Sequence, residues 1–113
     1  MENVENPVNQ EQQNEKKGVL TIKWEGKWML MDSKLFLTAN GKNLGIFSFK
    51  KGFVTTMPLT SESVVLTIQH NVRNQSFGFP VNPSENYTLT LTYDRMTISF
   101  GFMLFDQNGK RVK

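Results

Sequence analysis

Apolar and polar side chains alternate with a period of two along most of the chain from Val19 onward. This period is typical of β-strands that bury one face, and no useful stretch shows the i, i+3, i+4 spacing of an amphipathic helix. Turn-forming residues separate the alternating segments at intervals of roughly ten residues. The pattern predicts strands at 19–24, 34–39, 42–47, 53–57, 64–69, 75–79, 87–93 and 96–102, with a further short run at 28–31 after a turn at 25–26.

Segment 34–47 contains the clearest hairpin signal. Asn40–Gly41 is favoured in a two-residue type I′ turn, because both central residues of that turn need positive φ. A second interpretation is that Gly45 marks a β-bulge, which would shift the register of the residues after it. Without a bulge, the turn predicts the cross-strand pairs Ala39–Lys42, Leu37–Leu44, Phe36–Gly45 and Leu35–Ile46.

Segment 86–102 predicts a second hairpin, with its turn at Asp94–Arg95. One face of this hairpin is apolar, and the other carries mainly threonine and serine. Such a division is typical of an antiparallel strand pair with one face in water. The predicted pairs are Tyr93–Met96, Leu91–Ile98, Leu89–Phe100 and Tyr87–Phe102.

Short strands at this spacing predict an all-β domain, which is a single antiparallel β-sandwich or small barrel of about eight short strands. The predicted domain spans 18–113. Residues 1–17 are rich in Asn, Gln and Glu and have too few apolar side chains to offset the entropy of ordering, so a disordered N-terminal tail is expected. This segment lacks the pattern of a signal peptide, so a cytoplasmic location is expected if Met1 is the native start.

Composition and charge narrow the classes of function. The chain has no cysteine, which excludes disulfide scaffolds, thiolate metal sites and thiol catalysis. The net charge is +3, and it becomes +5 without the tail, whose four glutamates face two lysines. The basic residues are scattered rather than gathered in a stripe, which disfavours nucleic-acid binding. No apolar run approaches the ~20 residues of a membrane helix, so no membrane insertion is expected.

Candidate chemistry is sparse. His70 is the only histidine, it extends the apolar face of strand 64–69, and no G-x-S-x-G nucleophile motif accompanies it. The sequence contains no Ca²⁺-binding loop, no zinc-ligand spacing and no phosphate-binding glycine loop. These observations predict a protein that is not an enzyme and that uses no cofactor or metal.

Aromatic side chains interleaved with lysine are the most distinctive feature of residues 24–53. Two arrangements are open. In the first, both faces of hairpin 34–47 are buried, or a bulge turns Phe47 and Phe49 inward. In the second, an exposed aromatic patch rimmed by lysine binds a protein, a sugar or a single-stranded nucleic acid. The candidate binding residues are Trp24, Trp28, Lys34, Phe36, Phe47 and Phe49.

Segment 34–68 reads strand, N-G-x-x-x-G, strand, Gly, strand, polar turn and strand. This order resembles the small β-sandwich modules of the PEGA type, and the resemblance extends to about residue 93. At 82–83 the chain has Asn-Pro where such modules place Pro-Gly, so the motif is only partly kept. The resemblance implies a β-sandwich with an accessory, non-enzymatic role, and it transfers no site residue.

These observations lead to three hypotheses about function. The first is a non-catalytic binding module for another protein chain, which would bind at an edge strand or at the Phe36/Phe47 face. The second is carbohydrate binding through Trp24 and Trp28, which lie on neighbouring strands if 25–27 is a turn. The third is weak binding of single-stranded nucleic acid. A homodimer that forms through edge strands is compatible with the first hypothesis.

Overall fold

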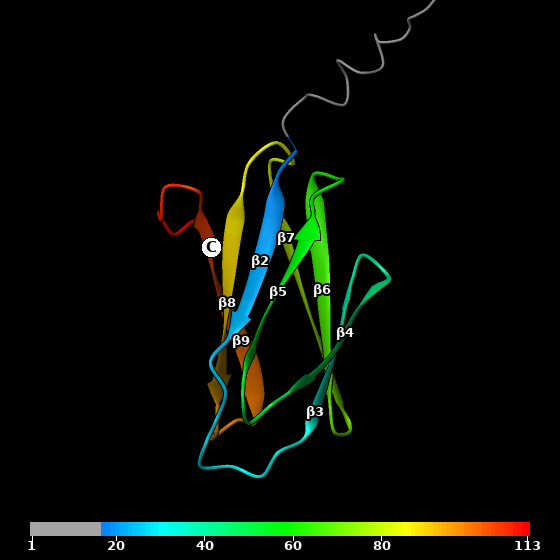
Figure 1. Cartoon of the computed structure of the whole chain (residues 1–113), viewed down its shortest axis with the longest axis vertical. Coiled ribbons are helices and arrows are strands. Elements are labelled where there is room, and N and C mark those ends of the chain that lie inside the picture. Colours follow the sequence, from blue (N-terminus) through cyan, green and yellow to red (C-terminus); the bar gives the residue numbers. More distant parts are fainter. Residues whose placement is uncertain (1–16) are drawn as a thin grey trace, which may run out of the picture.

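The computed structural model describes residues 17–113 and confirms the all-β prediction (Figure 1). Two four-stranded sheets have the strand orders β5-β2-β8-β9 and β4-β3-β6-β7. The predicted tail, apart from Lys17, lies outside the described residues. The strands are β2 (Val19–Trp24), β3 (Lys34–Ala39), β4 (Lys42–Ser48), β5 (Phe53–Pro58), β6 (Ser63–His70), β7 (Arg73–Pro80), β8 (Tyr87–Asp94) and β9 (Ser99–Asp106).

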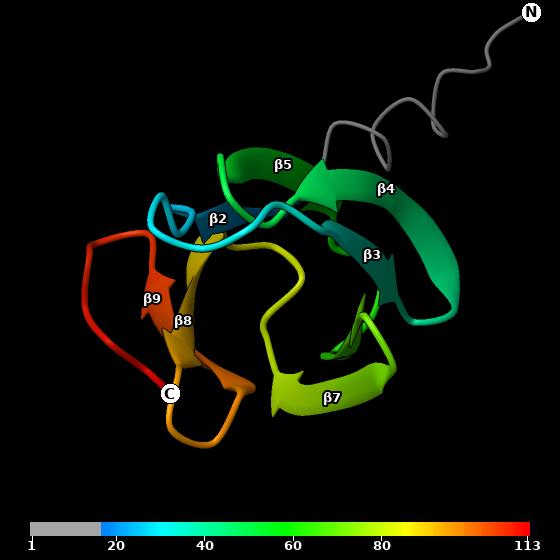
Figure 2. The ribbon, with the colours of Figure 1, turned by 90° about the horizontal axis from the view of Figure 1, so that it is seen from below.

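The core lies between the two sheets, which face each other in the end-on view of Figure 2. Alternate residues of the central strands point inward, so the period-two pattern of the sequence is the cause of this packing. Burying these aliphatic side chains stabilises the fold by about 1.5–3 kcal/mol for each fully buried residue. The largest fully buried side chains are Leu20, Ile22, Leu35, Leu37, Val64, Leu66, Ile68, Leu89 and Leu104.

Strand β2 lies between β5 and β8 and pairs with them in opposite ways. It pairs antiparallel with β5 and parallel with β8, where Leu20 faces Tyr87 and Ile22 faces Leu89. The other four pairings among the described residues are antiparallel. Because β5 pairs with β2 alone in this sheet, it lies at the edge.

The β3–β4 hairpin contains the β-bulge at Gly45, so the regular register with Leu37 opposite Leu44 is wrong. Leu44 is the extra residue, and Gly45 has a φ of 136°. Beyond the bulge the alternation changes phase, which turns the Phe47 ring toward the gap between the sheets. There it stacks on Phe53 with the ring centroids 4.3 Å apart. The observed pairs are Ala39–Lys42, Thr38–Asn43, Leu37–Gly45, Phe36–Ile46 and Leu35–Phe47.

The β8–β9 register also differs from the prediction, because a longer turn replaces Asp94–Arg95. Each residue of β8 pairs with a residue four positions further along β9 than predicted. Four is an even number, so Phe100 and Phe102 remain on the apolar face, whereas Met96 and Ile98 move into the turn. Leu104, which is 1% exposed, occupies the place opposite Leu89 that the sequence assigned to Phe100. The observed pairs include Tyr93–Phe100, Leu91–Phe102, Leu89–Leu104 and Tyr87–Asp106.

Residues 25–33 form a loop, so the short strand predicted at 28–31 is wrong. Gly26 and Gly52 bring this loop against the β4–β5 loop, backbone to backbone. Both have positive φ, of 95° and 86°. A Cβ atom on Gly26 would lie 2.3 Å from the Lys50 carbonyl oxygen, and one on Gly52 would lie 2.4 Å from the Trp24 carbonyl oxygen. Only glycine fits such an approach, which fixes where β2 ends.

Candidate functional site

Three of the six candidate binding residues lie in the interior. Trp24 is 4% exposed and Phe49 is 3% exposed. The Trp24 indole N–H donates to the Phe49 carbonyl oxygen at 2.7 Å, and the two rings stack. Phe47 is half-buried against the core and stacks on Phe53. This geometry corresponds to the inward arrangement of Phe47 and Phe49, and it leaves no continuous aromatic patch on this sheet.

The other three candidates are exposed; Trp28 lies in a loop, whereas Lys34 and Phe36 share the outer face of β3. Trp28 is in the β2–β3 loop and is 73% exposed. Phe36 points outward from β3, where it pairs with Ile46, and Lys34 is exposed at the start of β3. Trp24 and Trp28 are not on neighbouring strands, since β5 and β8 flank β2. A two-tryptophan platform for a sugar ring is therefore not formed.

An aromatic cluster closes the core at the end where β2, β4, β6 and β8 finish. Its members contact each other in stacked or edge-on geometry at centroid distances of 4.4–6.4 Å. Each member adjoins a loop, so the cluster holds the bases of four loops together. The cluster consists of Trp24, Phe49, His70, Tyr93 and Phe100.

His70 is a structural member of this cluster. Its ring is 8% exposed and stacks on Phe49 at 4.4 Å, and Ser33 Oγ lies 2.6 Å from its Nε2. Serine and histidine are two of the three members of a hydrolase triad, but the triad also needs a carboxylate to orient the ring. The neighbouring Asp32 carboxylate instead accepts hydrogen bonds from the Ser48 hydroxyl and the Lys50 backbone N–H. The Ser33–His70 contact thus ties loop 25–33 to β6.

Burial lowers the pKa of His70 from its ordinary value of 6.5. The unfolded chain therefore binds a proton more readily than the folded chain, and stability falls as the pH drops from 6.5 toward the folded pKa. Hydrogen bonds from Ser48 and Lys50 lower the pKa of Asp32 from 3.8, so the contribution of this carboxylate to folding stability is lost only in a more acidic range.

NMR titration of His70, the single imidazole, is expected to give a pKa below 6.5. A value at or above 6.5 would contradict its burial in the aromatic cluster.

The β9 edge is covered by other parts of the chain. Along β9, the C-terminal residues pair with the strand, because Val112 N–H donates to Leu104 C=O and Asp106 N–H donates to Lys110 C=O. Further along β9, the Gln75 side chain bonds both the N–H and the C=O of Phe100, at 2.6 and 3.1 Å. These contacts occupy outward backbone groups of Phe100, Leu104 and Asp106 that would otherwise be available to another strand.

The β4 and β7 edges carry features that oppose strand pairing. The β4 edge is interrupted by the bulge at Leu44–Gly45 and starts with the exposed Lys42. The β7 edge ends at Pro80, which has no backbone N–H, and presents the polar side chains of Asn74 and Ser76. Bulges, lysine and proline are devices that natural proteins use to protect sheet edges.

The β5 edge also ends at a proline, Pro58, but it is open before that residue. Leu59 N–H donates to Gly18 C=O at 3.0 Å, which sets the phase of the antiparallel ladder between β5 and β2. Hydrogen bonding alternates along such a ladder, so alternate residues of β5 bond to β2 and those between them point away. The backbone N–H and C=O groups of Val54 and Thr56 therefore point outward, without a partner among the described residues.

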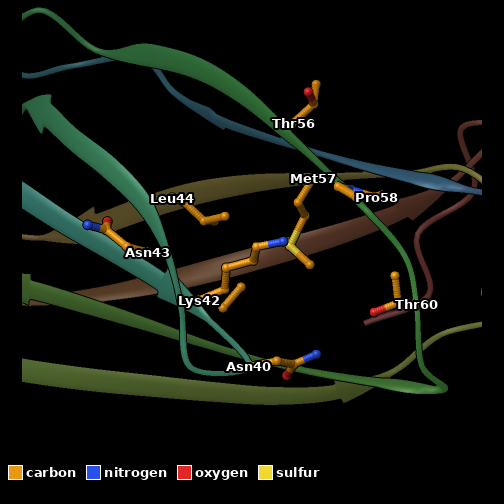
Figure 3. Close-up of a pocket in the computed structure, with 9 residues that line it drawn as sticks. Asn40, Lys42, Asn43, Leu44, Thr56, Met57, Pro58 and Thr60 are labelled. Atoms are coloured by element: carbon orange, nitrogen blue, oxygen red, sulfur yellow. The ribbon is translucent and has the colours of Figure 1, made fainter.

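A groove of about 350 Å³ runs beside this edge, between β4 and β5 (Figure 3). Leu44 and Met57 supply apolar lining, and Thr56 and Pro58 lie on the β5 side. Lys42 also lines the groove, and its side chain points toward the Met57 side in the view of Figure 3. Sequence patterning did not single out these residues, because nothing local in the chain indicates which strands become edges.

Comparisons with known proteins add no functional assignment. No protein-family model matches the chain, and no curated protein matches it. Residues 17–113 include no helix long and apolar enough to cross a membrane. Within the same residues, no group of three or more His, Asp or Glu side chains is arranged to hold a metal ion.

Proposed function

We propose that this protein is a non-catalytic binding module that receives an extended segment of another polypeptide along β5. The observation that carries the proposal is the open edge at Val54 and Thr56 beside a groove that Leu44 and Met57 line with apolar surface. An extended segment can add to such an edge through backbone hydrogen bonds, while alternate side chains enter neighbouring pockets. The accessory role implied by the PEGA-type resemblance is compatible with this proposal.

The groove sets the chemistry of the partner. Its apolar lining from Leu44 and Met57 favours an aliphatic or aromatic side chain on the face of the segment that turns inward. Lys42 is the charged side chain of the groove and favours an acidic residue nearby. A single buried apolar anchor and one partly screened ion pair are consistent with modest affinity, which suits a module that binds reversibly.

Selection of peptides from a displayed random library on the full chain tests the proposal. Thr56→Pro removes the outward N–H of residue 56 without removing a hydrogen bond to β2, so it is expected to weaken binding of the enriched peptide by up to about tenfold, the loss of one hydrogen bond. Ser76→Pro makes the same change at the β7 edge and is expected to leave binding unchanged.

Three outcomes would overturn the proposal. They are the absence of any enriched peptide, equal binding by the two proline variants, and occupation of β5 by a second copy of this chain. The last is detected by sedimentation as a dimer that Thr56→Pro converts to a monomer. Circular dichroism and urea unfolding of both variants separate a lost contact from a lost fold.

A further inference from the structure

Four loops meet at the end of the sandwich that is lowest in Figure 1 and faces the viewer in Figure 2. They join β2 to β3, β4 to β5, β6 to β7 and β8 to β9. We call this region the loop end, which consists of residues 25–33, 49–52, 71–72 and 95–98. The aromatic cluster lies directly beneath it, so the loops project from a packed base.

Exposed large apolar side chains are concentrated at the loop end. Six of them lie there, and their exposed fractions range from 51% to 98%. The loops at the opposite end span 40–41, 59–62, 81–86 and 107–110. Their large apolar residues, Leu59 and Val81, are buried, so those described loops expose none. The six exposed residues of the loop end are Trp28, Met29, Met31, Val72, Met96 and Ile98.

The loop end is also basic. Six lysine or arginine residues lie in these loops or at the first position of the following strand, against Glu25 and Asp32 in the loops and Asp94 at the end of β8. Two of the three carboxylates already accept backbone N–H groups inside the loops, Asp32 from Lys50 and Asp94 from Met96. These carboxylates keep their negative charge, but the six basic residues outnumber the three acidic ones and make the loop end basic. The basic residues are Lys27, Lys34, Lys50, Lys51, Arg73 and Arg95.

One of these six exposed apolar residues has an unusual backbone conformation. Ile98 has a φ of 55°, which is a left-handed conformation that a β-branched residue rarely adopts. Its side chain is nevertheless 51% exposed, so core packing does not explain the strained conformation. Strain that the surrounding structure maintains at an exposed position is often associated with a functional surface.

We infer that the loop end binds the surface of an anionic phospholipid bilayer. The six exposed apolar side chains, which we call the apolar tips, enter the boundary between headgroups and acyl chains. The basic side chains lie at the lipid phosphates. The chain docks peripherally and nothing crosses the bilayer. The inference uses a different surface from the β5 edge and does not depend on the strand-addition proposal.

The shape and composition of the loop end favour a bilayer over other anionic partners. The tips project from separate loops, which suits a soft apolar layer that closes around each of them. Single-stranded nucleic acids bind through several stacked aromatic rings, but Trp28 is the one aromatic residue among the six exposed tips. An acidic protein would match the charge, and the test below includes it as an opposing outcome.

Trp28 fluorescence provides the first test on the full chain. Trp24 is already buried, so a change on binding reports Trp28. Vesicles of phosphatidylcholine with phosphatidylserine are expected to shift the emission to the blue, and brominated acyl chains are expected to quench it. Vesicles of phosphatidylcholine alone are expected to have little effect. Raising the salt concentration should weaken binding, because the Debye length shortens to about 3 Å at 1 M.

Two sets of variants separate the apolar and the charged contributions. Met29→Ser/Met31→Ser/Met96→Ser is expected to weaken vesicle binding at least about tenfold, because the buried methionine surface is lost. The control Val54→Ser/Val65→Ser removes exposed apolar residues from the sheets and should bind the vesicles normally.

Lys50→Glu/Lys51→Glu is expected to weaken binding about tenfold or more, since each basic residue near an anionic surface contributes roughly 1 kcal/mol. Lys110→Glu/Lys113→Glu makes the same change in net charge at the other end and should bind normally.

The inference is overturned if the chain does not bind phosphatidylserine vesicles, or if the control variants lose binding as strongly as the loop-end variants. It is also overturned if the methionines instead mediate self-association, seen as a dimer that the triple serine variant abolishes. Binding of polyglutamate or single-stranded RNA in preference to the vesicles, with the same loss in the variants, would assign the loop end to that class of partner.

Discussion

Replacing Trp24 with alanine is expected to lower the free energy of unfolding by about 3–5 kcal/mol, as is typical of a buried aromatic residue. Trp24 stacks on Phe49 and meets Tyr93 and Phe100 edge-on. Alanine would leave a cavity at the centre of the aromatic cluster and would leave the Phe49 carbonyl without its indole donor. For a domain whose total stability is about 5–15 kcal/mol, the loss removes a large part of the whole.

Trp28→Ala is the matched control, since the same change occurs four residues away at a side chain that is 73% exposed. Its expected effect on stability is within about 0.5 kcal/mol, as for most surface substitutions. Urea unfolding followed by far-ultraviolet circular dichroism measures both. Equal losses for the two variants, or a stable Trp24→Ala protein, would contradict the assignment of Trp24 to the core.

Gln75→Leu is expected to cost about 2 kcal/mol, because an unsatisfied buried donor or acceptor typically costs about 1–3 kcal/mol. The Gln75 amide bonds both backbone groups of Phe100, a residue that is only 6% exposed. Leucine keeps a similar size but bonds neither group. The variant also uncovers part of the β9 edge, so sedimentation is expected to detect self-association at high concentration.

Gln69→Leu controls for the change of side chain, because Gln69 is exposed on the outer face of β6. It is expected to change stability by less than about 0.5 kcal/mol and to remain monomeric. Both variants make the same change of side chain, but only the Gln75 amide bonds to another strand. A Gln75→Leu protein as stable as Gln69→Leu would show that the bonds to Phe100 contribute nothing to the sandwich.

Alternation predicted the faces of the strands better than it predicted their partners. In β8, the division between buried leucines and outward threonines was confirmed, yet every partner on β9 was four residues off. A shift of an even number of residues leaves the hydrophobic pattern unchanged, so the pattern cannot reveal it. The parallel pairing of β2 with β8 joins residues more than sixty positions apart, and no local signal indicates it.

The candidate binding residues were harder to predict because exposure depends on tertiary contacts. Phe47 changes faces because of one extra residue in β4, and the glycine at 45 that makes this possible was visible in the sequence. The run at 28–31 is apolar enough to suggest a strand, but the close contact of Gly26 with the next loop ends β2 and leaves Met29 and Met31 in solvent. Gathering of the four loops at one end follows from strand direction alone.

Amide hydrogen exchange of the full chain, resolved by residue in ¹⁵N–¹H spectra with and without a selected peptide, tests the proposed function most directly. The outward N–H groups of Val54 and Thr56 have no partner among residues 17–113, so they are expected to exchange rapidly and to slow once the peptide adds to β5. The Ser76 amide on the β7 edge should exchange at the same rate in both spectra. Unchanged exchange at Val54 and Thr56, or slowing at Ser76 instead, would contradict strand addition at β5.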